Sequence, residues 1–392
     1  MSTVQAAEST TPQELIYPRL KNGIYISAFT SPEEKSITVA TSFHGIEICH
    51  GRARSIVEEF TGILSSVDIA SKLEVPLTTI ESIIKELLDA NFLDTHRNTI
   101  KLNNRFQSTI AERAIHTKDQ SKDAAYSQLQ TRLAPELSHV TGINGVKDGG
   151  VDIMTARQNY GVEIIGHSRT ATLLYSILLA SGVTNTRLTL SASYKHVTIA
   201  DSDLGSGLLR ITDLGVNFKK RLEELSREWS LFPVASSYAL AQRGAPKPTL
   251  PEKNLRIICG NFDALYVEKL VEEGFEHFFI GRAPGHVATI GPFVQPGVTP
   301  CRNCLGLIEA ERNGVAALTT PTGTSDELPI AVAHHVAALA GHAALSFIDT
   351  GKCELLGAQL TVDFLDPLAP TLRNFPAHPS CTCLWPKEDL LL

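Results

Sequence analysis

The chain has 392 residues, of which 43% are hydrophobic and 20% are charged, so it can build two or three domains that each have a core. This composition excludes a disordered or fibrous protein. The net charge of -7 excludes a global positive field that would attract nucleic acid or an anionic membrane. Residues 1–14 are polar and read as a disordered tail without the apolar run of a secretory signal. We therefore expect a cytoplasmic protein.

Residues 15–97 are expected to form a first domain. β-type runs are indicated at Ile24–Ser27, Ser36–Ala40 and Ile46–Cys49, and two short helices at Arg54–Phe60 and Val67–Leu73. A third helix, capped by Thr78 or Thr79, is indicated by apolar residues at helical spacing: Ile80, Ile83, Ile84, Leu87 and Leu88. Three strands followed by three helices are typical of a winged helix-turn-helix domain, to which Thr99–Leu102 would add a wing strand.

The charge of this domain argues against DNA binding. Between Arg52 and His96 there are four Lys or Arg and eight Asp or Glu, a net charge of 4 - 8 = -4. Such a segment cannot hold phosphates by releasing counterions, which weakens the hypothesis of a winged-helix regulator. Two interpretations remain open: an internal packing module, and a domain that captures an extended peptide against the edge strand Ile46–Cys49.

The second part of the chain alternates strands and helices. Residues 98–158 read as a linker that contains a helix near Ala124–Leu137. From Val162 onward we expect strands at Val162–Ile165, Arg187–Leu190, His196–Ala200 and Leu255–Cys259, and helices at Thr170–Ala180, Phe218–Trp229 and Ala264–Glu273. This alternation predicts an α/β domain over residues 159–392 with a parallel, Rossmann-like sheet that binds ligands at the carboxyl ends of its strands. The apolar stretch Pro329–Ile348 is interrupted by three histidines and reads as a buried helix that packs internally or against a second subunit.

Four of the seven cysteines form two close pairs. Cys301 and Cys304 make a CxxC, and Cys381 and Cys383 make a CxC. Two thiolate pairs can close a tetrahedral zinc site, and four thiolates leave no open coordination position, so such a zinc would be structural.

A degenerate nucleotide-binding turn follows the strand Val162–Ile165. In a dinucleotide fingerprint this turn would read G-x-G-x-x-G or A, and here only Gly166 remains, with Ser168 at the second glycine position. Arg169 is a candidate for contact with an anion, and Ser191 stands where an acidic ribose ligand is expected. We interpret this region as a Rossmann-type scaffold that has lost residues needed to bind a nucleotide.

Two segments resemble a known family. Residues 291–305, GPFVQPGVTPCRNCL, resemble the GPLVxPGxTPCxxCL segment of ThiF-like proteins (Ocin-ThiF) from clusters that make azole-containing ribosomal peptides. Residues 379–383, PSCTC, resemble the second zinc pair of that family, and residues 15–97 resemble a PqqD-like peptide-recognition domain fused ahead of it. The resemblance implies a ThiF or ubiquitin-activating-type fold with a structural zinc.

Ubiquitin-activating-type relatives adenylate a carboxylate, and this chain departs from their pattern. Gly260 precedes Asn261-Phe262 where the family has its magnesium-binding Asp, whereas Arg210 matches the family's basic residue. Adenylation and ATP binding by this chain alone are therefore not expected. An adenylating enzyme that acts on a peptide or carrier-protein carboxylate remains the alternative.

The resemblance implies a non-catalytic subunit of an ATP-dependent cyclodehydratase complex. Such a subunit binds the leader of a precursor peptide and presents its core to a YcaO-type partner, which makes azolines from Cys, Ser or Thr. We expect the leader to add a strand beside Ile46 and Ile48, with its apolar side chains against Ile80, Ile84 and Leu87. These three side chains could equally belong to the core. A homodimer is also compatible with the sequence.

Overall fold

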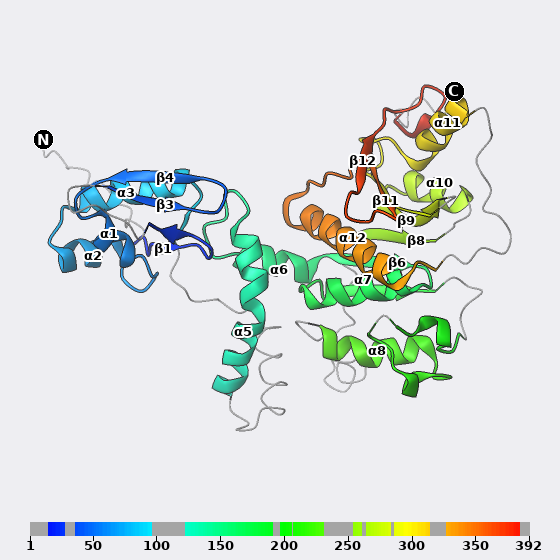
Figure 1. Ribbon diagram of the computed structural model, residues 1–392, viewed down its shortest axis with the longest axis horizontal. Coiled ribbons are helices and arrows are strands. Elements are labelled where there is room, and N and C mark those ends of the chain that lie inside the picture. Colours follow the sequence, from blue (N-terminus) through cyan, green and yellow to red (C-terminus); the bar gives the residue numbers. More distant parts are fainter. Residues whose placement is uncertain are drawn as a thin grey trace, which may run out of the picture. The chain divides into compact units, whose positions relative to one another are not determined.

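The computed structural model describes residues 15–27, 36–95, 122–190, 197–205, 207–230, 254–260, 264–283, 286–313 and 327–384 (Figure 1). The described chain forms two compact units. The first contains residues 15–27, 36–95 and 126–154, and the second contains residues 122–125 and the described residues from Thr155 onward. The predicted wing strand at Thr99–Leu102 lies outside the described residues.

The first unit combines a small antiparallel sheet with three helices. Strands β2 (Tyr25–Ile26), β3 (Ser36–Ala40) and β4 (Gly45–Cys49) form a sheet of order β2-β3-β4, so β4 is an edge strand. Strands β1 (Arg19–Leu20) and β5 (Leu93–Asp94) pair separately. The helices are α1 (Ala53–Glu58), α2 (Ser66–Leu73) and α3 (Leu77–Asp89), followed by α5 (Lys122–Thr141). The expectation of three strands and then three helices is confirmed for residues 24–89.

Local sequence explains where these helices begin. The Ser65 hydroxyl accepts a hydrogen bond from the Asp68 N–H, and the Asp68 carboxylate accepts one from the Ser65 N–H, so a capping box starts α2. Helix α3 begins one residue after Pro76, with no side-chain cap. The predicted cap at Thr78 or Thr79 is wrong, because proline already fixes the backbone that leads into the helix.

The second unit is built on a seven-stranded mixed sheet of order β12-β11-β10-β9-β8-β6-β7. Strands β6 (Gly161–Ile165), β7 (Asn185–Thr189), β8 (Asn254–Cys259) and β9 (Glu276–Ala283) are parallel to one another. Strands β10 (Val287–Val294), β11 (Ala358–Asp363) and β12 (Thr371–Asn374) continue the sheet in antiparallel fashion. The α/β prediction is confirmed, and the sheet is only partly parallel.

The helices of this unit carry much of its core. They are α6 (Val151–Asn159), which begins just before the unit, α7 (Arg169–Ala180), α8 (Phe218–Trp229), α10 (Ala264–Glu272), α11 (Arg302–Asn313) and α12 (Ile330–Thr350). Helix α12 packs along α7 (Figure 1), and a Cβ added at Gly341 would lie 2.9 Å from Ile177 Cγ2, so a glycine permits this close approach. By length and composition α12 could span a membrane, but 56% of its most apolar window is buried, as expected of a core helix.

One predicted strand does not form. His196–Ala200 was expected to be a strand, but within residues 197–200 only Thr198 makes an isolated bridge, to Asn217. The chain turns at once into a short 3-10 helix, Asp201–Asp203, because the Asp203 carboxylate accepts the Ala200 N–H at 2.8 Å. This turn positions Asp203 for the site described below.

A buried ion pair joins α6 to α12 within the second unit. The Arg157 guanidinium donates to both carboxylate oxygens of Asp349 at 2.7 and 2.6 Å, and both side chains are at most 1% exposed. Arg157 also donates to the Ser181 carbonyl oxygen at 2.8 Å. The bidentate geometry and the additional bond satisfy charges that would otherwise be costly to bury.

His277 on β9 makes the stability of the second unit depend on pH. Its side chain is fully buried, its Nδ1 lies 2.7 Å from the Phe275 carbonyl oxygen, and burial lowers the pKa of this histidine to about 4. The unfolded chain, with a histidine pKa near 6.5, therefore binds a proton that the folded chain excludes, and stability falls as the pH drops from about 6.5 toward 4.

We predict that this histidine alone removes about 2–3 kcal/mol of unfolding free energy between pH 7 and pH 4.5. His277→Asn keeps a donor for the Phe275 carbonyl and removes the titration, so the variant should lose correspondingly less stability over the same interval. The first unit contains no tryptophan and Trp229 lies in the second, so tryptophan fluorescence follows the unfolding of the second unit in urea. Identical pH profiles for the two proteins would contradict the assignment.

Candidate functional site

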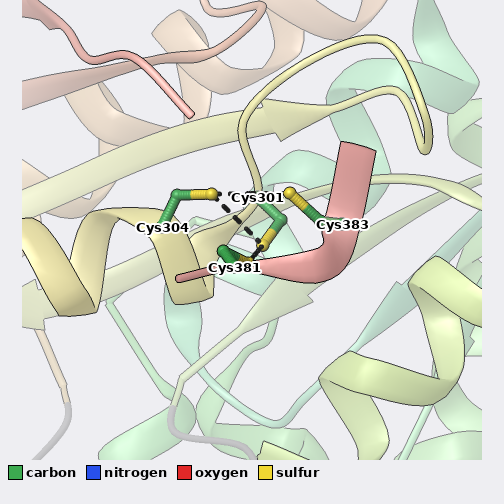
Figure 2. A group of neighbouring side chains, drawn as sticks. All are labelled: Cys301, Cys304, Cys381 and Cys383. Atoms are coloured by element: carbon green, nitrogen blue, oxygen red, sulfur yellow. Dashed lines mark hydrogen bonds between the residues drawn. The ribbon is translucent and has the colours of Figure 1, made fainter. Parts of the chain in front are cut away.

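The four paired cysteines come together at one place. Cys301 and Cys304 lie at the start of α11, and Cys381 and Cys383 lie at and inside the short 3-10 helix Thr382–Leu384 near the C-terminus (Figure 2). Their sulfur atoms all lie within 4.8 Å of one another, and three of the four residues are buried. Separations of 3.6 Å for Cys301–Cys381 and 3.4 Å for Cys304–Cys383 are close to the roughly 3.8 Å that a tetrahedron with 2.3 Å zinc–sulfur bonds requires.

These residues therefore fit a structural zinc ion. The cluster lies in a small apolar core with Val294, Leu305 and Phe375, which shields it from solvent. His378 is next to the cluster, but its Nε2 is 2.9 Å from the Glu311 carboxylate, so it is engaged elsewhere. A zinc held by these four sulfurs would have a full coordination shell and would tie the C-terminal segment to α11.

The turn after β6 leads into α7, as predicted, but two of its backbone donors are already engaged. The Ser168 hydroxyl accepts the Ala171 N–H at 3.1 Å and so caps the helix. The Arg169 N–H donates to both carboxylate oxygens of Glu327 at 3.3 Å each. Two of the backbone donors that would hold phosphate in a dinucleotide-binding fold are thus engaged by side chains of this chain.

Gly166 is required for a reason other than phosphate contact. Its φ is +139°, and a Cβ at this position would lie 2.2 Å from the Cys259 carbonyl oxygen. Its N–H donates to the Thr189 carbonyl oxygen at 3.1 Å. The glycine of the fingerprint therefore serves the packing of β6 between β7 and β8.

Negative charge surrounds the same helix terminus. Asp203 is buried and lies 3.1 Å from His167 Nε2. Burial opposes ionisation of Asp203, but hydrogen bonds from His167 and the Ala200 N–H lower its pKa below the usual range. Burial raises the pKa of Glu327, with the nearby Asp203 charge acting in the same direction. The Asp203 and Glu327 carboxylates oppose the entry of a triphosphate here, so the described residues at this helix terminus do not fit ATP.

Two arginines predicted for a nucleotide site make hydrogen bonds within the chain. The Arg169 side chain donates to the Ser202 carbonyl oxygen at 2.6 Å, and so it holds the neighbouring loop. Arg210 is exposed at the start of another 3-10 helix, Ile211–Asp213, where its N–H donates to Asp213. Ser191 and Asn261-Phe262 lie outside the described residues.

The open edge of β4 is a feature of the first unit that can receive an extended ligand. Ile46 is half-buried on this strand, whereas Ile48 is 1% exposed. Ile80 and Leu87 are fully buried and Ile84 is 3% exposed, all in one core cluster with Ile48. Ile80, Ile84 and Leu87 thus form the inner face of α3, which favours the core alternative, and their contact with a leader stays a prediction. The half-buried apolar residues of α3 are Leu77 and Leu88, at its two ends.

Sequence reasoning did not find Glu327. It is separated from Arg169 by 158 positions and stands in no recognisable motif, so nothing in the sequence signals that it reaches the N-terminus of α7. Glu47, on the exposed side of β4, carried no sequence signal either.

This chain is an α/β protein of two units, and the parallel part of its large sheet is Rossmann-like. No family model and no curated protein matches the sequence. Solved structures match over almost the whole chain. Escherichia coli MccB with the peptide MccA-N7isoAsn superimposes with a TM-score of 0.60 at 13% identity, covering 94% of this chain and 99% of that chain.

Two further MccB structures superimpose on this chain equally well. MccB with ATP superimposes with a TM-score of 0.60 at 14% identity, covering 93% of this chain and 99% of that chain. The microcin C7 biosynthetic enzyme MccB with N-formylated MccA gives 0.60 at 12% identity, with 94% and 99% covered. This chain therefore has an MccB-like fold.

The cysteine cluster generates a direct prediction. Protein purified without added metal should contain one zinc per chain by elemental analysis, and Cys304→Ser should lose it together with much of the thermal stability of the second unit, because the binding energy of a structural zinc is folding energy. Cys353→Ser, which changes a half-buried cysteine outside the cluster, is the matched control and should keep the metal. Zinc well below one equivalent in the wild type would contradict the assignment.

Proposed function

We propose that this chain is a peptide-binding subunit in the biosynthesis of a ribosomally made natural product. It binds the leader of a precursor peptide along β4 and presents the core of that peptide to a YcaO-type cyclodehydratase. The observation that carries the proposal is the Glu327 carboxylate on the Arg169 N–H, because it occupies a backbone donor where a Rossmann-like body would bind phosphate. The identity of the enzyme partner rests on the family resemblance of residues 291–305.

Three features support peptide binding by the first unit. Strand β4 ends its sheet with one edge unpaired among the described residues. The segment from Arg52 to His96 is acidic, which disfavours DNA. The MccB structures of the same fold contain the peptide MccA. A leader held here would raise the concentration of each core residue at the partner to about the millimolar range, so one enzyme could process several positions.

The strand edge can be tested without disturbing the rest of the sheet. Glu47→Pro removes one backbone donor from the edge while the ladder to β3 persists, since proline is tolerated where the N–H faces solvent. We expect this variant to bind the fluorescently labelled precursor peptide encoded beside the gene at least about fivefold more weakly than Glu47→Ala, which keeps the donor. Equal binding by the two variants, measured by fluorescence polarisation on the full chain, would exclude strand addition at β4.

An ATP-dependent adenylating enzyme is the second candidate function. It is favoured by the MccB-like fold, since one MccB structure contains ATP. We expect the purified chain to give no ATP–pyrophosphate exchange above background, with or without the precursor peptide. Exchange that depends on the peptide would replace the scaffold proposal with this second function.

A further inference from the structure

The hydrogen-bonding register of the small sheet determines which residues of β4 face a bound peptide. The Ser27 N–H donates to the Thr38 carbonyl oxygen at 2.8 Å, so Thr38 faces β2. The Thr41 N–H donates to the His44 carbonyl oxygen at 2.8 Å and closes the hairpin between β3 and β4. In an antiparallel ladder the bonded pairs alternate, so the next bonded pairs after Thr41–His44 are Val39–Ile46 and Ile37–Ile48.

The main-chain groups of the intervening residues therefore point to the open edge. These residues are Gly45, Glu47 and Cys49, and no hydrogen bond to their N–H or C=O groups is found among the described residues. Three donors and three acceptors in this spacing match one extended peptide of about five residues.

Side chains alternate in the same register. Ile46 and Ile48 point into the core side of the sheet, whereas Glu47 and Cys49 are exposed on its outer face. In an added strand, the residue opposite Glu47 places its side chain on the outer face beside this carboxylate. Its two neighbours point to the core side, beside Ile46 and Ile48, where apolar side chains would be buried.

The charges around this edge favour a cation opposite Glu47. The Ser36 hydroxyl donates to one Glu47 oxygen at 2.5 Å, and no cation pairs with this carboxylate in the described part of the chain. Several cations of the unit are engaged elsewhere: Arg54 with Glu58, Lys72 with Glu59, and Arg19 with Asp94. On α3 the exposed Glu81, Glu86 and Asp89 outnumber Lys85 and add to the negative field.

We propose that the segment recognised by β4 carries a Lys or Arg at the position opposite Glu47 and an apolar residue on each side of it. This inference rests on the proposed function and specifies its ligand: an alternating apolar–basic–apolar strand. A favourable cross-strand charge pair should tighten binding by a factor of about 2–5 over a neutral residue, and an acidic residue there should weaken it by a similar factor.

A random peptide display library selected on the full chain tests this specificity. Wild type should enrich peptides with a basic residue between two apolar ones, and Glu47→Lys should enrich peptides with an acidic residue at that position. The same consensus on both proteins would overturn the charge inference and leave peptide binding at β4 intact. No enrichment on either protein above the Glu47→Pro control would overturn the proposed function as well.

Cys49 provides a second readout of the register. It is exposed, and its main chain faces the open edge two residues beyond Glu47. Directly opposed residues in an antiparallel hydrogen-bonded pair have Cα atoms about 5.5 Å apart, which suits a disulfide. A selected peptide with a cysteine two residues from its basic residue should therefore form a disulfide with the wild type but not with Cys49→Ser. Equal trapping of a cysteine directly next to the basic residue would overturn the register.

Discussion

The first turn of α7 leaves backbone N–H groups at the carboxyl ends of the parallel strands, and this chain engages two of them with its own side chains. The Glu327 carboxylate accepts the Arg169 N–H and the Ser168 hydroxyl accepts the Ala171 N–H. In a nucleotide-binding relative of this architecture, phosphate oxygens take such donors. The fold holds the Glu327 carboxylate next to the N-terminus of α7. An external phosphate would therefore have to displace this carboxylate, and the negative charge of Asp203 would repel it.

Three other features of the second unit stabilise its fold. Arg157 and Asp349 join α6 to α12, Gly341 lets α12 approach α7, and the four cysteines fit a zinc that ties the C-terminal segment to α11. None of these features has an open coordination position or a free nucleophile. The feature of the described chain that we propose as its ligand-binding site is the unpaired hydrogen-bonding edge of β4.

Some of this organisation could be predicted from the sequence and some could not. The helices and strands followed from short-range periodicity, as at Ile80–Leu88, and the metal cluster followed from the spacing of Cys301, Cys304, Cys381 and Cys383, because thiol chemistry is specific. The contact between Glu327 and Arg169 could not be predicted, since it joins positions 158 apart through the packing of α12 on α7. The inward orientation of Ile80, Ile84 and Leu87 was also hidden, because helical periodicity identifies an apolar face without saying what covers it. The antiparallel strands β10–β12 were not predicted, although Pro284-Gly285 between β9 and β10 is a turn signal in the sequence.

A crystal structure of the full chain grown with ATP and magnesium tests the central claim most directly. The account predicts electron density for the Glu327 carboxylate on the Arg169 N–H and no nucleotide at the N-terminus of α7. A triphosphate bound above Gly166 with Glu327 displaced would contradict it.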